Sequence, residues 1–236
     1  GVQDFLWTDL PAGSHFAVQV ISVKGHAEAS STIAAEWTYP LVPRKLSVKA
    51  EKGNPALSVA WAKPVSKPER CQLQLRHPEN STLLQHHTLT QWQVSHIFQR
   101  LVPGRNYSIS LICVAGPYKN SSEMIVTPIE PSHVKNLQCL PDTTSMFLNW
   151  TIIENDIKSY ELIVNKFPKR ILQQPILALV VSQTNVTLVE LTTNTSYQIQ
   201  VNAVGRNDIK GPSVTIMCNT SVEGIDSNLT IDCTKS

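Results

Sequence analysis

Apolar and polar residues alternate in three short segments that are widely separated along the chain. The segments are FAVQV at 16–20, YSISLIC at 107–113 and YQIQVNA at 197–203, and each begins with an aromatic residue. Alternation with a period of two places the apolar side chains on one face and predicts half-buried β-strands. No stretch shows the 3.6-residue spacing of an amphipathic helix over more than two turns. The chain is therefore expected to be all-β.

A leucine precedes each of these aromatic residues by six positions, so the three segments form a repeat. The pairs are Leu10 with Phe16, Leu101 with Tyr107, and Leu191 with Tyr197. The aromatic residues lie 91 and 90 residues apart, and two tryptophans that end apolar strands, Trp61 and Trp150, lie 89 apart. A period of this length is the size of a small β-sandwich and is longer than a solenoid repeat.

A tryptophan on an early strand, followed by LVPGRNY at 101–107, resembles the pattern of fibronectin type III domains. The resemblance implies that the leucine packs inside, while the tyrosine hydroxyl satisfies a backbone group at the corner between strands E and F. Phe16 lacks this hydroxyl, and Thr193-Asn194 replaces Pro-Gly in the third copy, which predicts a weaker turn there. The expected fold is a tandem array of fibronectin type III (immunoglobulin-like) β-sandwiches.

The repeat also sets the expected domains. Residues 1–40 would hold only the C-terminal part of a sandwich, with part of strand E followed by F and G, and should fold poorly alone because the inner face is exposed. Complete fibronectin type III domains are expected at 41–129 and 130–220, joined by the proline-containing linkers TYPLVP and TPIEPS. Residues 221–236 are a tail or the start of a further module.

Strands can be assigned to both complete domains from the same alignment. In the middle domain they are A 45–51, B 57–61, C 71–76, E about 92–98, F 107–113 and G about 124–127. In the third domain they are A about 135–140, B 146–151, C 160–164, C′ near 177–181, E 186–191, F 197–204 and G 214–218.

The segment LTQWQVSHIFQRLVPGRNYSISL and the linker AEWTYPL are similar to the tandem repeats of receptor-type protein tyrosine phosphatases of the R3 group. The similarity is good for the middle domain and the linkers. It is poorer for the third domain, whose added cysteines depart from that pattern. The resemblance implies a single-pass receptor whose phosphatase domain lies outside this chain, and other fibronectin type III receptors remain an alternative.

Asparagine sequons point to the secretory pathway. Composition predicts roughly two or three Asn-x-Ser/Thr motifs by chance, and each is an acceptor only in a secreted chain. The eight present begin at Asn80, Asn106, Asn120, Asn149, Asn185, Asn194, Asn219 and Asn228. Asn106 and Asn149 are expected to face outward, since the neighbouring Tyr107 and Trp150 face inward.

Five cysteines without C-x-x-C spacing fit an oxidising compartment better than a zinc site. In the fibronectin type III fold, strands C and F are antiparallel neighbours, which makes a bond between Cys71 and Cys113 plausible. The alternative is two free thiols in the core. Cys139 on strand A and Cys218 on strand G could tie the third domain's edges together. Cys233 is then left over, as a free thiol, an intermolecular bond or the partner of a cysteine outside this chain.

The sequence carries no motif for catalysis. It lacks Cys-x5-Arg, Gly-x-Ser-x-Gly, a phosphate-binding glycine loop and His-Glu-x-x-His. Four histidines gather in the middle domain, and exposed sheet-edge residues are favoured over a metal site or an enzyme built on them: His77, His86, His87 and His96. A solvated strand face is likewise favoured over a glycosaminoglycan site for Arg44, Lys45, Lys49 and Lys52. No catalytic residue, metal or cofactor is expected.

Charge and hydropathy set the expected location and partners. A net charge of +2 implies neither nucleic acid nor an anionic membrane surface as partner. The longest apolar run, ILALVV at 176–181, is far shorter than the ~20 residues of a membrane helix. The chain also begins without a methionine or a leader, as expected for an excerpt of a longer protein. Membrane attachment is expected only through a transmembrane segment absent from this chain.

The sequence thus predicts an extracellular ligand-binding, adhesion and spacer segment of a cell-surface receptor, by resemblance a receptor-type tyrosine phosphatase. It would lie outside the plasma membrane, or be secreted, and would bind an extracellular protein ligand or a cell-surface co-receptor. The alternative is a fibronectin type III region of a neural adhesion or extracellular-matrix protein.

Overall fold

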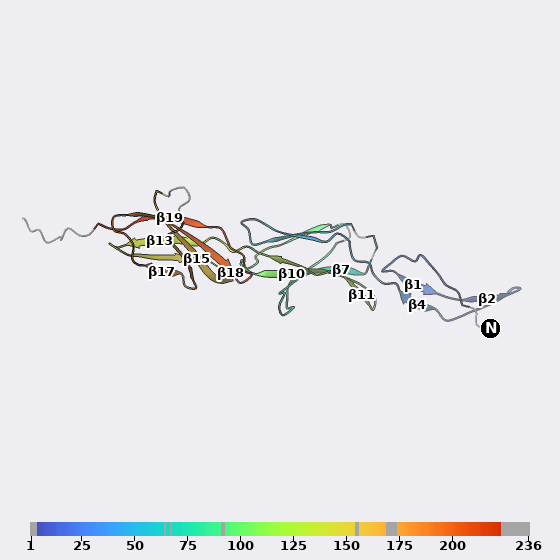
Figure 1. Cartoon of the computed structure of the whole chain (residues 1–236). Helices are drawn as coiled ribbons and strands as arrows, with labels where there is room; N and C mark the ends of the chain where they lie inside the picture. Colours follow the sequence, from blue (N-terminus) through green and yellow to red (C-terminus); the bar gives the residue numbers. More distant parts are fainter. Residues whose placement is uncertain are drawn as a thin grey trace, which may run out of the picture. The chain divides into compact units, whose positions relative to one another are not determined.

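Every regular element in the described part of the chain is a β-strand (Figure 1), which confirms the predicted all-β fold. The computed structural model describes residues 4–63, 65–66, 68–90, 93–153, 156–168 and 174–222. Contacts divide the chain into two compact units, and each is treated separately below. The first unit comprises residues 1–101 and 106–129, and the second comprises 102–105 and 130–236.

Residues 41–129 form two sheets, here called the middle sandwich. One sheet has the order β5 (Ser47–Ala50), β6 (Leu57–Ala60), β9 (Ser95–Phe98). The other has the order β11 (Tyr118–Ser121), β10 (Asn106–Ala115), β7 (Arg70–Arg76), β8 (Leu83–Thr88), and β12 (Ile125–Pro128) also pairs with β10. Strands A, B and E thus form one sheet, and C′, C, F and G form the other.

The core of the middle sandwich follows from the alternation in its strands. In β7 and β10, every second residue is buried, including Leu73, Leu75, Ile109 and Leu111. Side chains from both sheets contribute to one buried cluster. Because side chains alternate between the two faces of a strand, every second one points toward the facing sheet. Burial of these side chains stabilises the pair of sheets.

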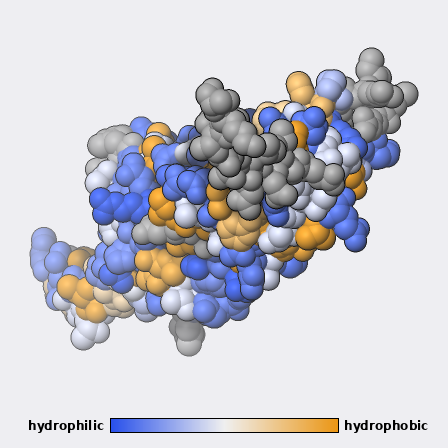
Figure 2. Space-filling view, turned by 90° about the vertical axis from the view of Figure 1, so that its left-hand side faces the viewer, coloured by the Kyte–Doolittle hydropathy of each residue, from blue (hydrophilic) through white to orange (hydrophobic). Residues whose placement is uncertain are grey.

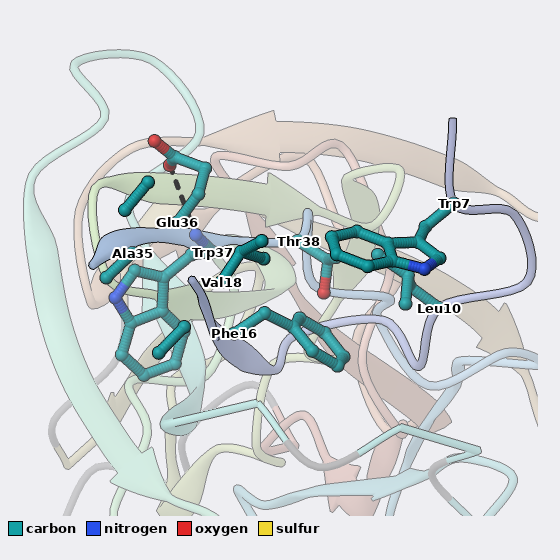
Figure 3. Close-up of a pocket in the computed structure, with 10 residues that line it drawn as sticks. Trp7, Leu10, Phe16, Val18, Ala35, Glu36, Trp37 and Thr38 are labelled. Atoms are coloured by element: carbon teal, nitrogen blue, oxygen red, sulfur yellow. Dashed lines mark hydrogen bonds between the residues drawn. The ribbon is translucent and has the colours of Figure 1, made fainter. Parts of the chain in front are cut away.

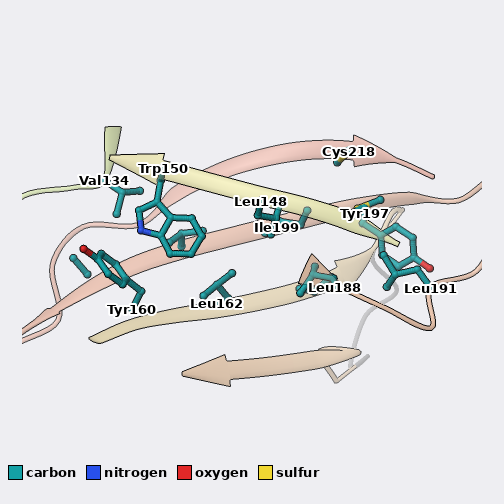
Figure 4. Close-up of a cluster of buried hydrophobic side chains, with 14 residues drawn as sticks. Val134, Leu148, Trp150, Tyr160, Leu162, Leu188, Leu191, Tyr197, Ile199 and Cys218 are labelled. Carbon is teal, nitrogen blue, oxygen red and sulfur yellow. The ribbon is translucent and has the colours of Figure 1, made fainter. Parts of the chain in front are cut away.

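Residues 130–222 repeat the same arrangement, here called the third sandwich. One sheet has the order β13 (Lys135–Pro141), β14 (Met146–Thr151), β17 (Asn185–Leu188). The other has the order β16 (Leu177–Val181), β15 (Ile157–Lys166), β18 (Ser196–Gly205), β19 (Val214–Asn219). In the core between them, Trp150 meets Tyr160 edge to face, with ring centroids 5.2 Å apart (Figure 4). Burial raises the pKa of Tyr160, because the phenolate would lose its hydration.

Residues 4–40, here called the N-terminal segment, form a long antiparallel ladder in two parts. β1 (His15–Val18) pairs with β4 (Ala34–Trp37), and β2 (Ile21–Lys24) pairs with β3 (Ala27–Ser30). Residues 4–14 contain no strand. Among the described residues, neither buried core cluster contains a side chain from this segment.

The expected strands of the two complete sandwiches are found within a few residues of their positions, but two further strands were not predicted. These are β8 and β11, both in the sheet that contains strand F of the middle sandwich. Strand E of the third sandwich ends at Leu188 and not at Leu191, because the chain turns through a left-handed residue at Glu190. Residue 92, at the expected start of strand E in the middle sandwich, lies outside the described residues.

Candidate functional site

The corner before strand F of the third sandwich is built around Tyr197. Its ring is 1% exposed, and its phenol oxygen accepts a hydrogen bond from the backbone N–H of Thr192 at 2.9 Å. Leu191 packs in the same buried cluster (Figure 4). The ring therefore fills core volume while the hydroxyl satisfies a backbone donor, which is the role that the family resemblance implied.

The other corner residues of the two complete sandwiches are also buried. Leu101 and Tyr107 belong to the core cluster of the middle sandwich, as does Trp61, whose indole N–H donates to Gln93 O at 3.0 Å. Trp150 occupies the matching position in the third sandwich. These side chains fix the strands around each corner by packing and not by surface contacts.

The backbone of the corner is the same in all three copies. The residue before the leucine is left-handed each time, with φ of 59°, 57° and 60° at Asp9, Arg100 and Glu190. The residue three positions after the leucine is left-handed too, with φ of 69°, 83° and 47° at Gly13, Gly104 and Asn194. Asparagine tolerates this region better than most residues. The Thr-Asn turn of the third copy therefore reaches the same geometry as Pro-Gly.

A threonine locks the corner in two of the copies. Thr220 Oγ1 donates to Thr192 O at 2.7 Å and accepts from Thr195 N at 3.0 Å. Thr38 makes the matching pair of bonds in the N-terminal segment, also at 2.7 and 3.0 Å. The sequence analysis missed this lock, although the two threonines follow their aromatic residues at nearly the same distance, 22 and 23 positions.

Some of the apolar side chains of the N-terminal segment line an open groove of about 490 Å³. Trp7, Leu10, Phe16 and Val18 face this groove (Figure 3). Leu10 is 42% exposed and Phe16 is half-buried, unlike their counterparts in the two sandwiches. Val20 does not continue the row of Phe16 and Val18, because β1 ends at Val18. No second sheet covers this face among the described residues.

The end of the N-terminal segment packs against the hairpin of β10 and β11. The Trp37 indole lies directly over Gly116, where an added Cβ would overlap the ring. Gly116 also has a φ of +52°, so the position requires glycine on both counts. The rings of Tyr39 and Tyr118 lie 4.2 Å apart.

Two hydrogen bonds also connect the end of the N-terminal segment to the hairpin of β10 and β11. The Tyr118 hydroxyl donates to Glu36 Oε1 at 3.1 Å, and this bond, together with the carboxylate charge, raises the pKa of Tyr118. Asn120 Nδ2 donates to Pro40 O at 3.0 Å. The linker after β4 is thus held by both aromatic and hydrogen-bonding contacts.

The structure forms both disulfides named in the sequence analysis. Cys71 and Cys113 face each other directly in the register of β7 and β10, with their Cα atoms 4.1 Å apart. Cys139 on β13 bonds Cys218 on β19 across the two sheets of the third sandwich, with Cα atoms 6.3 Å apart. Cys233 lies outside the described residues.

None of the sequon asparagines in the described chain is buried. Those that are exposed are Asn80, Asn185, Asn194 and Asn219, and those that are half-buried are Asn106, Asn120 and Asn149. Asn228 lies outside the described residues.

Two of the four histidines of the middle sandwich are in contact. His87 and His96 stack with ring centroids 3.9 Å apart, and His87 Nε2 lies 2.9 Å from Gln93 Oε1. Burial, with a smaller contribution from the charge of His87, lowers the pKa of His96. Within the described residues, no group of three or more His, Cys, Asp or Glu side chains could hold a metal ion. The four basic residues named above, at 44, 45, 49 and 52, are all exposed.

Comparisons with known proteins agree with this architecture. The model of the fibronectin type III domain family matches residues 132–217. The chain is 28% identical over 214 residues, or 91% of its length, to receptor-type tyrosine-protein phosphatase V of Rattus norvegicus. It is 27% identical over 161 residues, or 66% of its length, to tenascin of Mus musculus. It spans only 12% and 7% of the lengths of these two relatives.

A solved structure shows the same fold. The two-domain fibronectin type III segment of chicken tenascin covers 75% of this chain with a TM-score of 0.65 at 21% identity, and 99% of that segment is matched. The predicted tandem fibronectin type III fold is therefore confirmed. In the part of the chain that the structure describes, no helix has the length and apolar character needed to cross a bilayer.

Proposed function

We propose that this tandem array of fibronectin type III domains is an extracellular binding, adhesion and spacer segment of a receptor-type tyrosine phosphatase. The similarity to such a phosphatase carries the proposal, because it extends over 91% of the chain and well beyond the segment that matches the family model. The catalytic domain of the parent protein would lie outside this chain.

The construction of the two sandwiches suits a spacer outside the cell. Each sandwich has its own buried core and one internal disulfide, and such bonds persist in oxidising compartments. Of the seven sequon asparagines in the described chain, none is buried and four are exposed, which leaves those four accessible to sugar. Apolar and hydrophilic residues are interspersed on the face shown in Figure 2, as on the surface of a protein in water. These features support a location on the extracellular side of the plasma membrane, or in a secreted fragment.

We further infer that residues 1–40 are the C-terminal part of another fibronectin type III domain. The left-handed corner positions and the Thr38 lock repeat features of the third sandwich. In the parent protein, the groove around Trp7 and Phe16 would then be the inner face of that domain, covered by its own earlier strands. The loops and outer sheet faces would remain available for an extracellular protein ligand or a cell-surface co-receptor.

The similarity to tenascin favours a second candidate function. A fibronectin type III region of an extracellular-matrix or neural adhesion protein would have the same fold. The two candidates differ in what the parent protein contains beyond these domains.

An antibody raised against the secreted chain separates the two candidates. For a receptor phosphatase, the antibody should label intact cells and precipitate a membrane protein that hydrolyses a phosphotyrosine peptide. Recovery of the full-length product from the matrix alone, with no phosphatase activity, would contradict the receptor assignment and support the alternative.

A further inference from the structure

The outer face of the sheet β13–β14–β17 carries an aromatic residue beside a sequon. Phe147, Asn149 and Thr151 alternate along β14 with residues that point into the core. Figure 4 shows two of these inward residues, Leu148 and Trp150. Because alternate residues of a strand share a face, the Phe147 ring and the Asn149 amide are neighbours on the outside, about 7 Å apart along the strand.

Within the described residues, this part of the outer face exposes apolar side chains. Phe147 is 38% exposed, and its cross-strand neighbours are Leu140 on β13, which is 63% exposed, and Thr187 on β17. The residues opposite Asn149 are polar, Gln138 on one side and Asn185 on the other. An occupant of this face must therefore cover an aromatic ring and an aliphatic side chain next to an amide.

We propose that an N-linked glycan on Asn149 packs its first N-acetylglucosamine against Phe147 and the edge of Leu140. In the modification, Asn149 Nδ2 bonds to C1 of the sugar of a lipid-linked oligosaccharyl diphosphate. The bond from C1 to the diphosphate oxygen breaks, the lipid diphosphate leaves with its electron pair, and Nδ2 loses one proton. The proposal rests on the secretory location inferred above.

The chemistry of the sugar fits the site. A pyranose ring has one face made largely of C–H groups, and such a face packs on the electron-rich face of an aromatic ring. The linkage at Asn149 starts on the same side of the sheet as Phe147, so the first sugar reaches the ring without leaving the surface. The glycan would then bury apolar area that the folded chain exposes.

A second aromatic residue in the chain precedes a sequon by two positions and provides a contrast. Tyr118 precedes Asn120 in the same spacing, but its ring already packs on Tyr39 and its hydroxyl bonds Glu36. Asn120 Nδ2 itself donates to Pro40 O. A sugar on Asn120 therefore finds its aromatic neighbour covered, so the packing proposed for Asn149 is specific to that sequon.

The test is a double-mutant cycle on the full chain secreted from mammalian cells, with glycopeptide mass spectrometry to show which sequons carry sugar. Asn149→Gln should lower the melting temperature of the third sandwich by about 4 °C when Phe147 is present. In the Phe147→Ala background, the same substitution should cause less than half of that shift. Asn219→Gln provides the matched control, because that sequon lies on β19 in the other sheet and Met217, not an aromatic residue, precedes it by two positions, so its effect should be the same in both backgrounds.

Sugar resonances provide a readout independent of stability. After trimming to a single N-acetylglucosamine per site, protons of the Asn149-linked sugar should show an upfield ring-current shift that disappears in Phe147→Ala. Equal effects of Asn149→Gln in both backgrounds and an unshifted sugar would overturn the packing. Secreted protein with sugar at other sequons but none at Asn149 would overturn it too, while leaving the proposed function intact. Absence of sugar from every sequon would instead contradict the extracellular location.

Discussion

The N-terminal segment and the third sandwich share one corner but differ in what lies behind it. Both have a left-handed residue before the corner leucine and a threonine hydroxyl that bridges two backbone groups. In the third sandwich, Leu191 and Tyr197 are buried under a second sheet, whereas Leu10 remains exposed. Local hydrogen bonds therefore shape the corner, while burial worth about 25 cal/mol per Å² requires a facing sheet.

The largest expected difference between the two regions comes from truncating an apolar side chain in each. Leu162→Ala should destabilise the third sandwich by about 3–5 kcal/mol, because Leu162 is buried in its core. Val23→Ala should change stability by less than about 0.5 kcal/mol, because Val23 lies exposed on β2. Urea titration read by pulsed hydrogen exchange of peptides from each region measures both values. Equal losses in the two regions would contradict the distinction drawn here.

Removing the disulfides tests whether each sandwich is closed by its own bond. The double substitution Cys139→Ala/Cys218→Ala should cost the third sandwich about 2–4 kcal/mol and leave exchange in β7 and β10 unchanged. Cys71→Ala/Cys113→Ala should do the reverse, with a loss of similar size. A loss that spreads over both sandwiches in either variant would show that they do not unfold separately.

Removing the hydroxyl of Tyr197 at the corner should lower stability by less than removing a disulfide. Tyr197→Phe leaves the Thr192 N–H without its acceptor and should destabilise the third sandwich by about 1–2 kcal/mol. Phe16→Tyr is the matched change in the opposite direction, and it should alter exchange in the N-terminal segment by less than about 0.5 kcal/mol, because no core holds that ring. A clear gain from Phe16→Tyr would mean that the hydroxyl alone builds the corner.

Lowering the pH should cause the smallest loss of stability, and this loss should occur in the middle sandwich. The pKa of His96 is lowered in the folded state, so the unfolded chain binds more protons near that pKa. The contribution of His96 to the free energy of unfolding should not change with pH above about pH 6.5. Below that value, the free energy of unfolding should fall as the pH drops. Replacing His96 with Gln should flatten this part of the pH profile of urea unfolding. An unchanged slope in His96→Gln would assign the acid sensitivity to other groups.

The strands could be predicted wherever alternation was strong. β14 has the predicted bounds because Met146, Leu148 and Trp150 fall at alternate positions, and β16 has them because LALVV is a short, continuous apolar run. β8 was missed because LLQHHT shows no alternation, and it pairs with β7 at the sheet edge. β11 was missed because YKNS is short and largely polar, and its position depends on the ladder with β10.

The corner could be predicted only in part. The leucine and aromatic residues have a recognisable spacing. The burial of these residues in the two complete sandwiches follows from the alternation of inward and outward positions along the strand. The left-handed residues Asp9, Arg100 and Glu190 leave no such signal, because none of them shares glycine's preference for positive φ. The threonine lock was missed for a similar reason, since a threonine at a strand end is common and its partners are backbone groups.

Native-state hydrogen exchange of the whole chain tests the central claim most directly, namely that one fold occurs twice in complete form and once without its facing sheet. Amides of β15 and β18 should exchange about 10³-fold more slowly than those of β1 and β4, relative to their intrinsic rates. This difference should persist although all four strands are hydrogen-bonded. Equal protection in the N-terminal segment and the third sandwich would contradict the claim.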